Sequence, residues 1–277
     1  MILDGREIKQ EILNDLKNEV IYLDEKPKLV VIQVGNNEAS NIYIKQKTKM
    51  CDYIGYNYEH IKLEETIQTE DILEIIKKLN KDKEVNGILV QMPLPDHIDT
   101  YAIQNAVLPE KDVDGLSDIN SGMLMHKKES LYPCTPYGVM ELLKRYDISV
   151  ESQNVTIVGR SNLVGKPLAL MMINAGATVT VCHSKTKNLD NYTRKADILV
   201  VATGKKHLIN ETMVKEGVIV IDVGITKEDD ALYGDVDFDS IKNKAKYITP
   251  VPGGVGPMTV AMLGENILKA YKMQRGE

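Results

Sequence analysis

Residues 154–167 read NVTIVGRSNLVGKP, a β-branched run that ends in a glycine turn and continues into a helical pattern. This order is typical of the first strand, turn and helix of a dinucleotide-binding unit, because backbone N–H groups at a helix N-terminus can hold a pyrophosphate. Ser161 stands where the usual pattern has its middle glycine, and Gly165 comes one position late. An ordinary strand-to-helix turn would also explain such a variant, so the surrounding chain must decide between the two interpretations.

The chain around this stretch alternates strand-like and helical patterns. The second half predicts a helix near 164–175, and strands at 155–158, 178–182, 198–202, 218–223 and 247–248. The first half predicts strands at 28–34, 59–63 and 86–91, and helices near 40–54 and 69–79 that follow a first helix lined by Ile8, Ile12, Leu16 and Val20. Such alternation is the signature of α/β architecture with parallel, doubly covered sheets.

We therefore predict two α/β domains with a cleft between them, the second a Rossmann-type doubly wound parallel sheet. Residues 1–140 form the first domain and residues 141–257 the second, and the helical pattern of 258–277 is expected to pack back onto the first. The 277 residues are enough for two domains of ordinary size.

Charge and composition exclude several functional classes. Lys plus Arg is 34 and Asp plus Glu is 40, which leaves a net charge of −6 and argues against a nucleic-acid partner. No apolar run reaches the about 20 residues of a membrane span, and the first ten residues lack the apolar core of a signal peptide, so we expect a cytoplasmic protein. Three separated cysteines and five scattered histidines predict reduced thiols and no metal site.

The end of the second predicted strand of the nucleotide domain indicates which cofactor binds. NAD-binding folds usually place Asp or Glu there for the ribose 2′-hydroxyl, but this chain has Ser184 and Lys185. With the guanidinium of Arg160, these groups suit a 2′-phosphate, so NADP is preferred to NAD. The alternative is that Lys185 and Arg160 are solvated surface charges.

Four polar residues of the first half are candidates for chemistry. Tyr43 and Lys47 are four residues apart in a helical pattern and share one face, although a solvated face is the usual explanation for such a pair. Gln91 ends a buried strand, and Asp114 lies in a tight loop, which are positions where α/β proteins meet their substrates.

Six motifs in order along the chain resemble those of the bifunctional methylenetetrahydrofolate dehydrogenase/cyclohydrolase family. They are Ser40-x-x-Tyr43-x-x-x-Lys47, Gln91-x-Pro-Leu-Pro, Lys111-Asp-Val-Asp114-Gly, Pro133-Cys-Thr-Pro136-x-Gly138, Gly159-Arg-Ser-x-x-Val-Gly-x-Pro167 and Pro250-Val-Pro-Gly-Gly-Val-Gly-Pro-Met-Thr259. The resemblance implies oxidation of 5,10-methylenetetrahydrofolate by NADP, followed by hydrolysis of the methenyl product to 10-formyltetrahydrofolate.

The resemblance also implies a role for each candidate in the first half. Lys47 matches the catalytic lysine, Tyr43 the tyrosine that stacks on the folate, Gln91 the partner of the lysine, and Asp114 the carboxylate that holds the pterin ring. Lys47 is expected to matter more for hydrolysis, because hydride transfer needs only alignment of the two rings. Leu116 and Ser117 depart from the aromatic residue and histidine that many relatives carry after the aspartate loop.

In the second half, the resemblance assigns the cofactor and the remaining substrate contacts. Gly159, Arg160 and Ser161 would hold the cofactor phosphates, Ser184 the 2′-phosphate region, and Ile225 the nicotinamide side. Gly253, Gly254 and Val255 would line the path of folate and hydride, and a homodimer is expected as in relatives.

Two other functions remain open from the sequence. A monofunctional NAD-dependent dehydrogenase could use the same fold, but Lys47 and the set of Arg160, Ser184 and Lys185 argue against it. A folate- or nucleotide-binding module without turnover would be expected to lack at least one of the four candidates in the first half. Cys134 as a nucleophile has no base beside it in the sequence, so we interpret it as structural.

Overall fold

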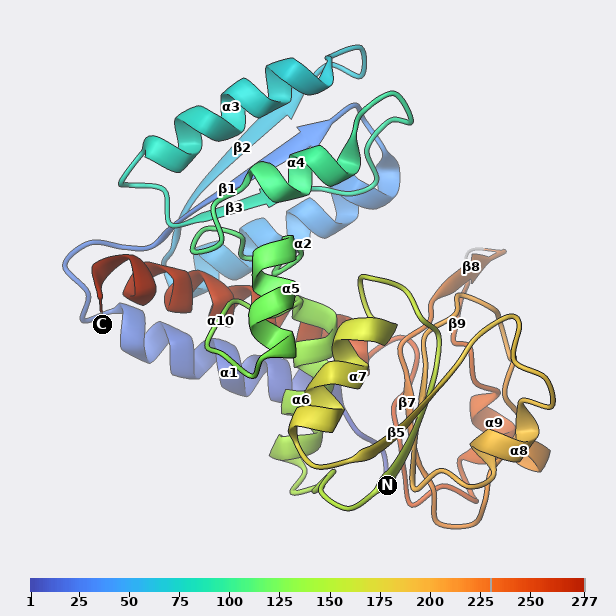
Figure 1. The fold of residues 1–277 in the computed structure, drawn as a ribbon. Coiled ribbons are helices and arrows are strands. Elements are labelled where there is room, and N and C mark those ends of the chain that lie inside the picture. Colours follow the sequence, from blue (N-terminus) through green and yellow to red (C-terminus); the bar gives the residue numbers. More distant parts are fainter. Residues whose placement is uncertain (230, 277) are drawn as a thin grey trace. The chain divides into compact units, whose positions relative to one another are not determined.

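The computed structural model describes residues 1–229 and 231–276 of the chain. They form two compact units, residues 1–10 with 135–259 and residues 11–134 with 260–277. Each unit contains its own parallel sheet (Figure 1), which confirms the predicted two-domain α/β fold. The predicted boundary near residue 140 stays a prediction.

The unit of residues 11–134 and 260–277 is built on a three-stranded sheet in the order β2-β1-β3. The strands are β1 (Lys28–Val34), β2 (Asn57–Leu63) and β3 (Gly87–Val90), and both pairings are parallel. Six of the seven residues of β1 are buried, as expected for a central strand covered on both faces. The helices within this unit are α2 (Glu38–Ile54), α3 (Thr69–Lys81), α4 (Thr100–Ala106) and α5 (Asp118–Met125).

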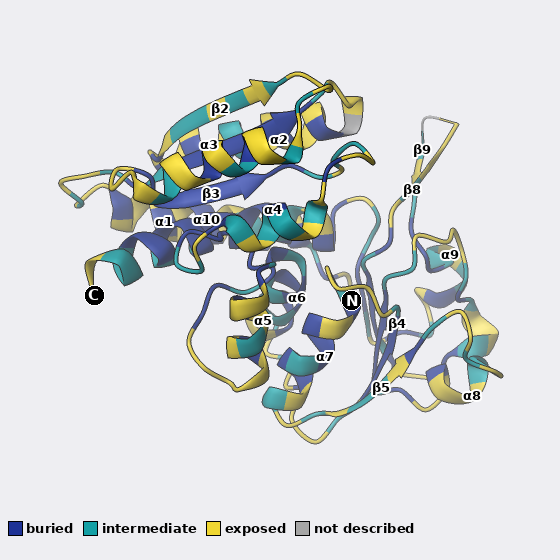
Figure 2. Cartoon of the chain, turned by 45° about the horizontal axis from the view of Figure 1, so that its top comes forward, coloured by how far each residue is buried: buried dark blue, intermediate teal, exposed yellow. Residues whose placement is uncertain are grey.

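Aliphatic side chains from the sheet and two helices make one core of this unit. Val30 and Ile32 of β1 pack with Ile72 and Ile76 of α3 and with Ile103 of α4. Figure 2 shows buried residues along β3 and on the inner sides of the surrounding helices. This packing fixes the carboxyl ends of β1 and β3, from which the polar candidates follow.

The other unit contains a five-stranded parallel sheet in the order β10-β7-β6-β4-β5. Helix α7 (Gly165–Asn174) joins β4 to β5, and the chain then crosses back to β6 on the other side of β4. The order therefore reverses between β4 and β6, and open α/β sheets bind ligands at such a reversal. The strands are β4 (Asn154–Val158), β5 (Thr178–Cys182), β6 (Ile198–Val201), β7 (Ile219–Asp222) and β10 (Tyr247–Ile248).

The first residues of the chain lie along β10. The backbone N–H of Leu3 donates to the carbonyl of Ile248 at 2.9 Å, and that of Ile248 donates to the carbonyl of Met1 at 3.0 Å. Helix α1 (Gly5–Val20) begins directly after this pairing. The start of the chain therefore covers one edge of the five-stranded sheet.

The remaining elements are mostly short. Helix α10 (Val255–Arg275) includes most of the helical pattern expected over 258–277, and α6 (Cys134–Arg145) precedes the five-stranded sheet in the chain, whereas the short elements carry too few residues for a clear period. The short elements are α8 (Asp190–Thr193), the 3₁₀ helix η1 (Glu211–Met213), β8 (Thr226–Glu228), β9 (Ala231–Tyr233) and α9 (Phe238–Ile241).

No helix within residues 1–229 and 231–276 is both long and apolar enough to cross a membrane. In the same ranges, no group of three or more His, Cys, Asp or Glu side chains could hold a metal ion.

Candidate active site

Lys47 and Gln91 come from different elements and meet directly. Lys47 lies in the middle of α2, and Gln91 is the first residue after β3. The ammonium of Lys47 donates a hydrogen bond of 2.8 Å to Gln91 Oε1. The pairing expected from the family motifs is therefore present in the structure.

The orientation of the Gln91 amide is set by its own turn. Gln91 Nε2 donates to the carbonyl oxygen of Met92 at 2.7 Å, which leaves Oε1 to face Lys47. Ser40 Oγ donates to the same carbonyl at 3.2 Å, so the start of α2 is joined to the end of β3. Ser40 and Gln91 are both buried, and this network fixes where the lysine ammonium lies.

The two aspartates of the loop after α4 have separate tasks. Asp112 accepts hydrogen bonds from the backbone of Gly115 and Ser117 at 3.0 and 2.8 Å, and from Asn120 Nδ2 at 3.0 Å. Asp112 therefore holds the loop in shape and binds it to the first turn of α5. Asp114 takes no part in those bonds, and its carboxylate interacts with Cys134 instead.

Burial and mutual charge govern the ionisation of Lys47, Asp114 and Cys134. Burial lowers the pKa of Lys47, and the Asp114 carboxylate opposes this shift. Burial also raises the pKa of Asp114, while Lys47 acts to lower it. The pKa of the Cys134 thiol is raised well above its usual value, first by burial and then by Asp114. Such perturbed groups, gathered beside one another, are typical of an active site.

Asn266 of α10 forms hydrogen bonds with the segments that carry Asp114 and Cys134, and the sequence analysis did not predict this role. Its Nδ2 donates to the carbonyls of Val113 and Tyr132 at 2.9 and 2.8 Å, and lies 3.6 Å from Cys134 Sγ. The thiol of Cys134 itself donates to the carbonyl of Val113 at 3.3 Å. Cys134 therefore serves as a buried structural group beside Asp114, and its raised pKa is the opposite of what a nucleophile needs.

A small cavity of about 20 Å³, large enough for one water molecule, lies beside Asp114. Leu116 lines it, so the departure from the family pattern falls next to the carboxylate. The other lining residues are Ile88, Val90, Met92, Gln104, Val107 and Asp112.

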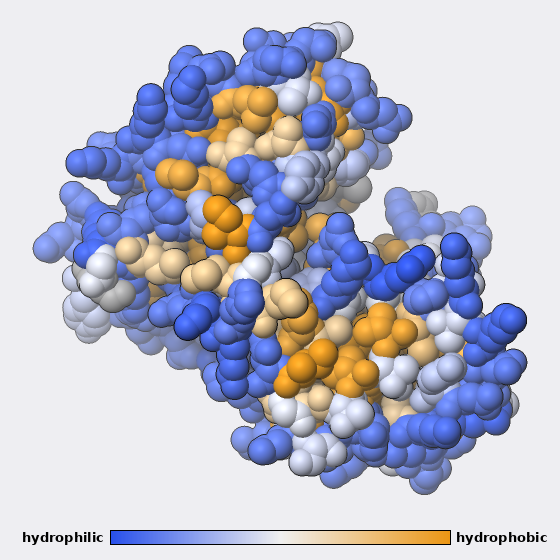
Figure 3. All heavy atoms as spheres, in the orientation of Figure 1, coloured by the Kyte–Doolittle hydropathy of each residue, from blue (hydrophilic) through white to orange (hydrophobic). Residues whose placement is uncertain are grey.

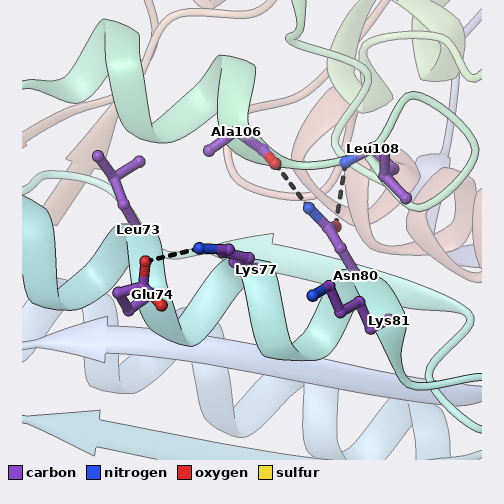
Figure 4. Close-up of a pocket in the computed structure, with 7 residues that line it drawn as sticks. All are labelled: Leu73, Glu74, Lys77, Asn80, Lys81, Ala106 and Leu108. Atoms are coloured by element: carbon purple, nitrogen blue, oxygen red, sulfur yellow. Dashed lines mark hydrogen bonds and ion pairs between the residues drawn. The ribbon is translucent and has the colours of Figure 1, made fainter.

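A larger pocket of about 440 Å³ opens between α3 and the segment after α4 (Figure 4). Within it, Lys77 pairs with Glu74 at 3.0 Å. Asn80 donates to the carbonyl of Ala106 at 2.7 Å and accepts from the backbone of Leu108 at 3.2 Å. This pocket lies where α3 packs against the end of α4, and none of the candidate residues lines it.

The turn after β4 is shaped for close approach of backbone to backbone. Gly159 has φ +133°, and a Cβ atom there would lie 2.3 Å from the carbonyl oxygen of Ala202. Only glycine fits such a position. Ser161 Oγ accepts from the backbone N–H groups of Val164 and Gly165 at 3.1 and 3.4 Å, so it also organises the first turn of α7.

Arg160, Ser184 and Lys185 lie at the ends of neighbouring strands. Gly159, which precedes Arg160, donates its backbone N–H to the carbonyl of Cys182 at 2.9 Å, and Ser184 and Lys185 follow Cys182 in the chain. All three side chains are exposed. None of them has a hydrogen bond or ion pair with another side chain in the described parts of the chain, so the glycine cradle and these free donors fit a phosphorylated dinucleotide.

The other predicted residues are placed as follows. Tyr43 lies one turn before Lys47 on α2 with 45% of its surface exposed, and Ile225, 43% exposed, follows β7. Gly253, Gly254 and Val255 are buried, and the carbonyl of Gly253 accepts the backbone N–H of Gly5 at 2.9 Å. Their contact with folate stays a prediction.

Comparison with known proteins identifies the family. Residues 3–114 match the catalytic domain of tetrahydrofolate dehydrogenase/cyclohydrolase, and residues 133–275 match its NAD(P)-binding domain. The bifunctional protein FolD of Oceanobacillus iheyensis is 50% identical over 275 residues, which cover 98% of this chain and 96% of that protein.

Two solved structures are similar over nearly the whole chain. The bifunctional methylenetetrahydrofolate dehydrogenase/cyclohydrolase of Campylobacter jejuni is 48% identical, with a TM-score of 0.97 over 99% of both chains. The enzyme of Trypanosoma brucei, solved with NADP cofactor and an inhibitor, is 35% identical, with a TM-score of 0.95 over 100% of this chain and 99% of that one. The chain belongs to the tetrahydrofolate dehydrogenase/cyclohydrolase family.

Proposed function

We propose that this chain oxidises 5,10-methylenetetrahydrofolate with NADP and hydrolyses the methenyl product to 10-formyltetrahydrofolate, with Lys47 carrying the hydrolytic step. The observation that supports this role is the partly buried hydrogen bond between Lys47 and the neutral Gln91. A lysine so placed has its charged form disfavoured. It can therefore exchange a proton at Nζ or orient the attacking water beside a cationic methenyl ring.

Asp114 is proposed to hold the pterin ring. A carboxylate offers two oxygens to the ring N–H and the amino group of a pterin, which fixes the register of the substrate. Asp112 supports this role because it shapes the loop and leaves Asp114 unengaged by the loop's backbone. Tyr43, exposed on the same helix as Lys47, supplies an aromatic face for stacking.

NADP, when bound, accepts the hydride. The residues proposed to hold it are Gly159 and Ser161 at the phosphates, Arg160 at the phosphates and, with Ser184 and Lys185, at the 2′-phosphate, and Ile225 at the nicotinamide. The support is their common position at the carboxyl ends of β4, β5 and β7, on either side of the reversal in strand order.

One assay tests the activity. Purified protein is incubated with methylenetetrahydrofolate and either NADP or NAD, and the reduced cofactor and the methenyl product are followed by separate absorbance signals. We expect reduced cofactor to form faster with NADP and the methenyl signal to decay faster than without enzyme. A methenyl signal that accumulates and decays only at the uncatalysed rate would indicate a monofunctional dehydrogenase, and no reduced cofactor would indicate a binding module.

We also infer that the chain forms a homodimer through β5. The start of the chain covers the edge of the sheet at β10, whereas β5 is the opposite edge and pairs only with β4 within the described residues. Ile173 and Val181 beside this edge are 54% and 38% exposed, and Figure 3 shows hydrophobic residues gathered over α7. Two β5 edges can pair about a two-fold axis.

In sedimentation experiments, Val181→Lys should convert a dimer to a monomer, and a monomeric wild type would refute this inference.

The cytoplasm is the proposed compartment. Cys51, Cys134 and Cys182 are all free and buried, and unpaired thiols are typical of a reducing environment.

A further inference from the structure

One buried carboxylate shapes the turn that follows β6. Asp235 Oδ2 accepts hydrogen bonds from Thr203 Oγ1 at 2.9 Å, from the backbone N–H of Gly204 at 3.1 Å and from the backbone N–H of Thr203. Its Oδ1 accepts from the backbone N–H of Lys205 at 2.7 Å. Asp235 is fully buried, so successive N–H groups of this turn form a nest around one anion.

The same carboxylate also packs against the backbone of the loop after β7. A Cβ atom on Gly224 would lie 2.0 Å from the carboxyl carbon of Asp235, so the backbone there packs directly against the carboxylate. Gly224 immediately precedes Ile225, the residue proposed for the nicotinamide side. Asp235 therefore fixes the backbone position of two loops, one after β6 and one after β7.

A second carboxylate holds Asp235 in place. Asp222, the last residue of β7, accepts from the backbone N–H of Asp235 at 3.0 Å and from that of Val236 at 2.9 Å. Burial raises the pKa of Asp222 to about 7, which is opposed by these backbone hydrogen bonds. The end of β7 is thus connected through two acidic side chains to the end of β6.

We propose that Asp235 is a positioning residue for the cofactor, which it serves by fixing the turn of residues 203–205 and the Gly224–Ile225 backbone beside the switch point of the sheet. This inference rests on the proposed binding of NADP at that end of the sheet. The carboxylate is required because it has only acceptor oxygens, and four donors converge on it. Asp235 is not proposed to touch a reacting atom.

The test is a direct binding measurement with NADPH as the probe, followed by its fluorescence, together with the rate of methenyl hydrolysis. Asp235→Asn places an amide NH₂ against backbone N–H donors, so we expect the dissociation constant for NADPH to rise by about tenfold or more. Hydrolysis uses no nicotinamide, and its proposed residues Lys47, Gln91 and Asp114 belong to the other compact unit, so its rate should stay within about twofold of wild type.

Thr203→Val is the milder second variant, because it removes only the Oγ1 hydrogen bond and keeps the shape of the side chain. We expect it to weaken NADPH binding by about threefold to tenfold while hydrolysis is unchanged. Asp239→Asn is the matched control, since this aspartate is exposed in the same segment and forms its ion pair with Lys242 at 2.6 Å.

Two results would overturn the proposal. NADPH affinity equal to wild type in a folded Asp235→Asn protein, or in Thr203→Val if the first variant does not fold, would remove the positioning role. A parallel loss of NADPH affinity and hydrolysis in Thr203→Val would indicate a general structural role instead. Loss of the dehydrogenase reaction in wild type would refute the proposed function separately, because the NADPH binding measurement does not depend on turnover.

Discussion

The ammonium of Lys47 and the amide oxygen of Gln91 lie 2.8 Å apart, and the partner of this half-buried lysine is therefore a neutral group. A carboxylate at that distance would hold the lysine in its charged form. The amide satisfies the N–H donor without adding a negative charge, so burial dominates and lowers the pKa of Lys47. The hydrogen bond to Gln91 thus holds Lys47 in place and still allows its Nζ to give up or accept a proton.

Gln91→Glu should reverse this effect. A carboxylate beside Nζ favours the ammonium, so the pKa of Lys47 rises and the neutral amine forms only at higher pH. The pH profile of methenyl hydrolysis should move to the alkaline side, and the rate at neutral pH should fall by about tenfold for each pH unit that the profile moves. Gln46→Glu, an exposed position on the same helix, is the control. An unchanged profile in Gln91→Glu would mean that the protonation of Lys47 does not limit hydrolysis.

Arg160→Ala should distinguish the two cofactors. The guanidinium is proposed to contact the 2′-phosphate, which NAD lacks, so the Michaelis constant for NADP should rise by about tenfold or more and that for NAD much less. Initial rates with each cofactor measure this difference. Lys187→Ala removes another exposed charge from the loop after β5 and serves as the control. Equal effects of Arg160→Ala on both cofactors would refute the assignment.

Gly159→Ala should destabilise the nucleotide unit. The new Cβ meets the carbonyl oxygen of Ala202 at 2.3 Å, and the backbone has φ +133°. We expect the free energy of unfolding to fall by about 2–4 kcal/mol, from strain and steric overlap together. Gly217→Ala, with φ +75° and no atom within 4 Å of its Cβ, provides a control that carries the strain alone and should cost about 1 kcal/mol. Urea unfolding of both variants measures the difference, and equal losses would contradict the close approach at Gly159.

The three thiols should be inert in the folded chain. Burial raises the pKa of Cys51 to about 12, and it also raises the pKa values of Cys134 and Cys182. Because the thiolate is the reactive form, iodoacetamide at pH 8 should label the native protein far more slowly than the protein unfolded in guanidinium. Mass spectrometry of both samples gives the comparison. Rapid labelling of Cys134 in the native state would indicate a reactive thiol beside Asp114.

The sequence predicted the main elements because they carry clear patterns, apolar runs for the buried strands and a helical period for the long helices. The run of residues 28–34 is a strand in the structure with the predicted bounds, and the helix predicted near 40–54 is α2. The hairpin of β8 and β9 and the short helices α4 and α5 were missed, because three to eight residues give too little periodicity to stand out from loops.

In the candidate site, the sequence motifs identified the residues, but most of the contacts between them could not be predicted. The motifs brought out Lys47, Gln91 and Asp114, and the structure places the first two in contact. That Asp112, and not Asp114, accepts the hydrogen bonds of the loop backbone could not be predicted, since both are aspartates in one loop and only the hydrogen bonds separate them. Asn266 and Asp235 lie far along the chain from the segments they hold, and spacing carries no signal for such contacts.

Lys47→Met gives the most direct test of the proposed chemistry. Methenyltetrahydrofolate is supplied directly, and its absorbance is followed with wild type, with Lys47→Met and with the exposed control Lys45→Met, while NADPH binding is measured in parallel. We predict a loss of about 100-fold or more in the rate of hydrolysis for Lys47→Met alone, with NADPH binding unchanged in all three proteins. Hydrolysis at the wild-type rate in Lys47→Met would contradict the central role given to this lysine.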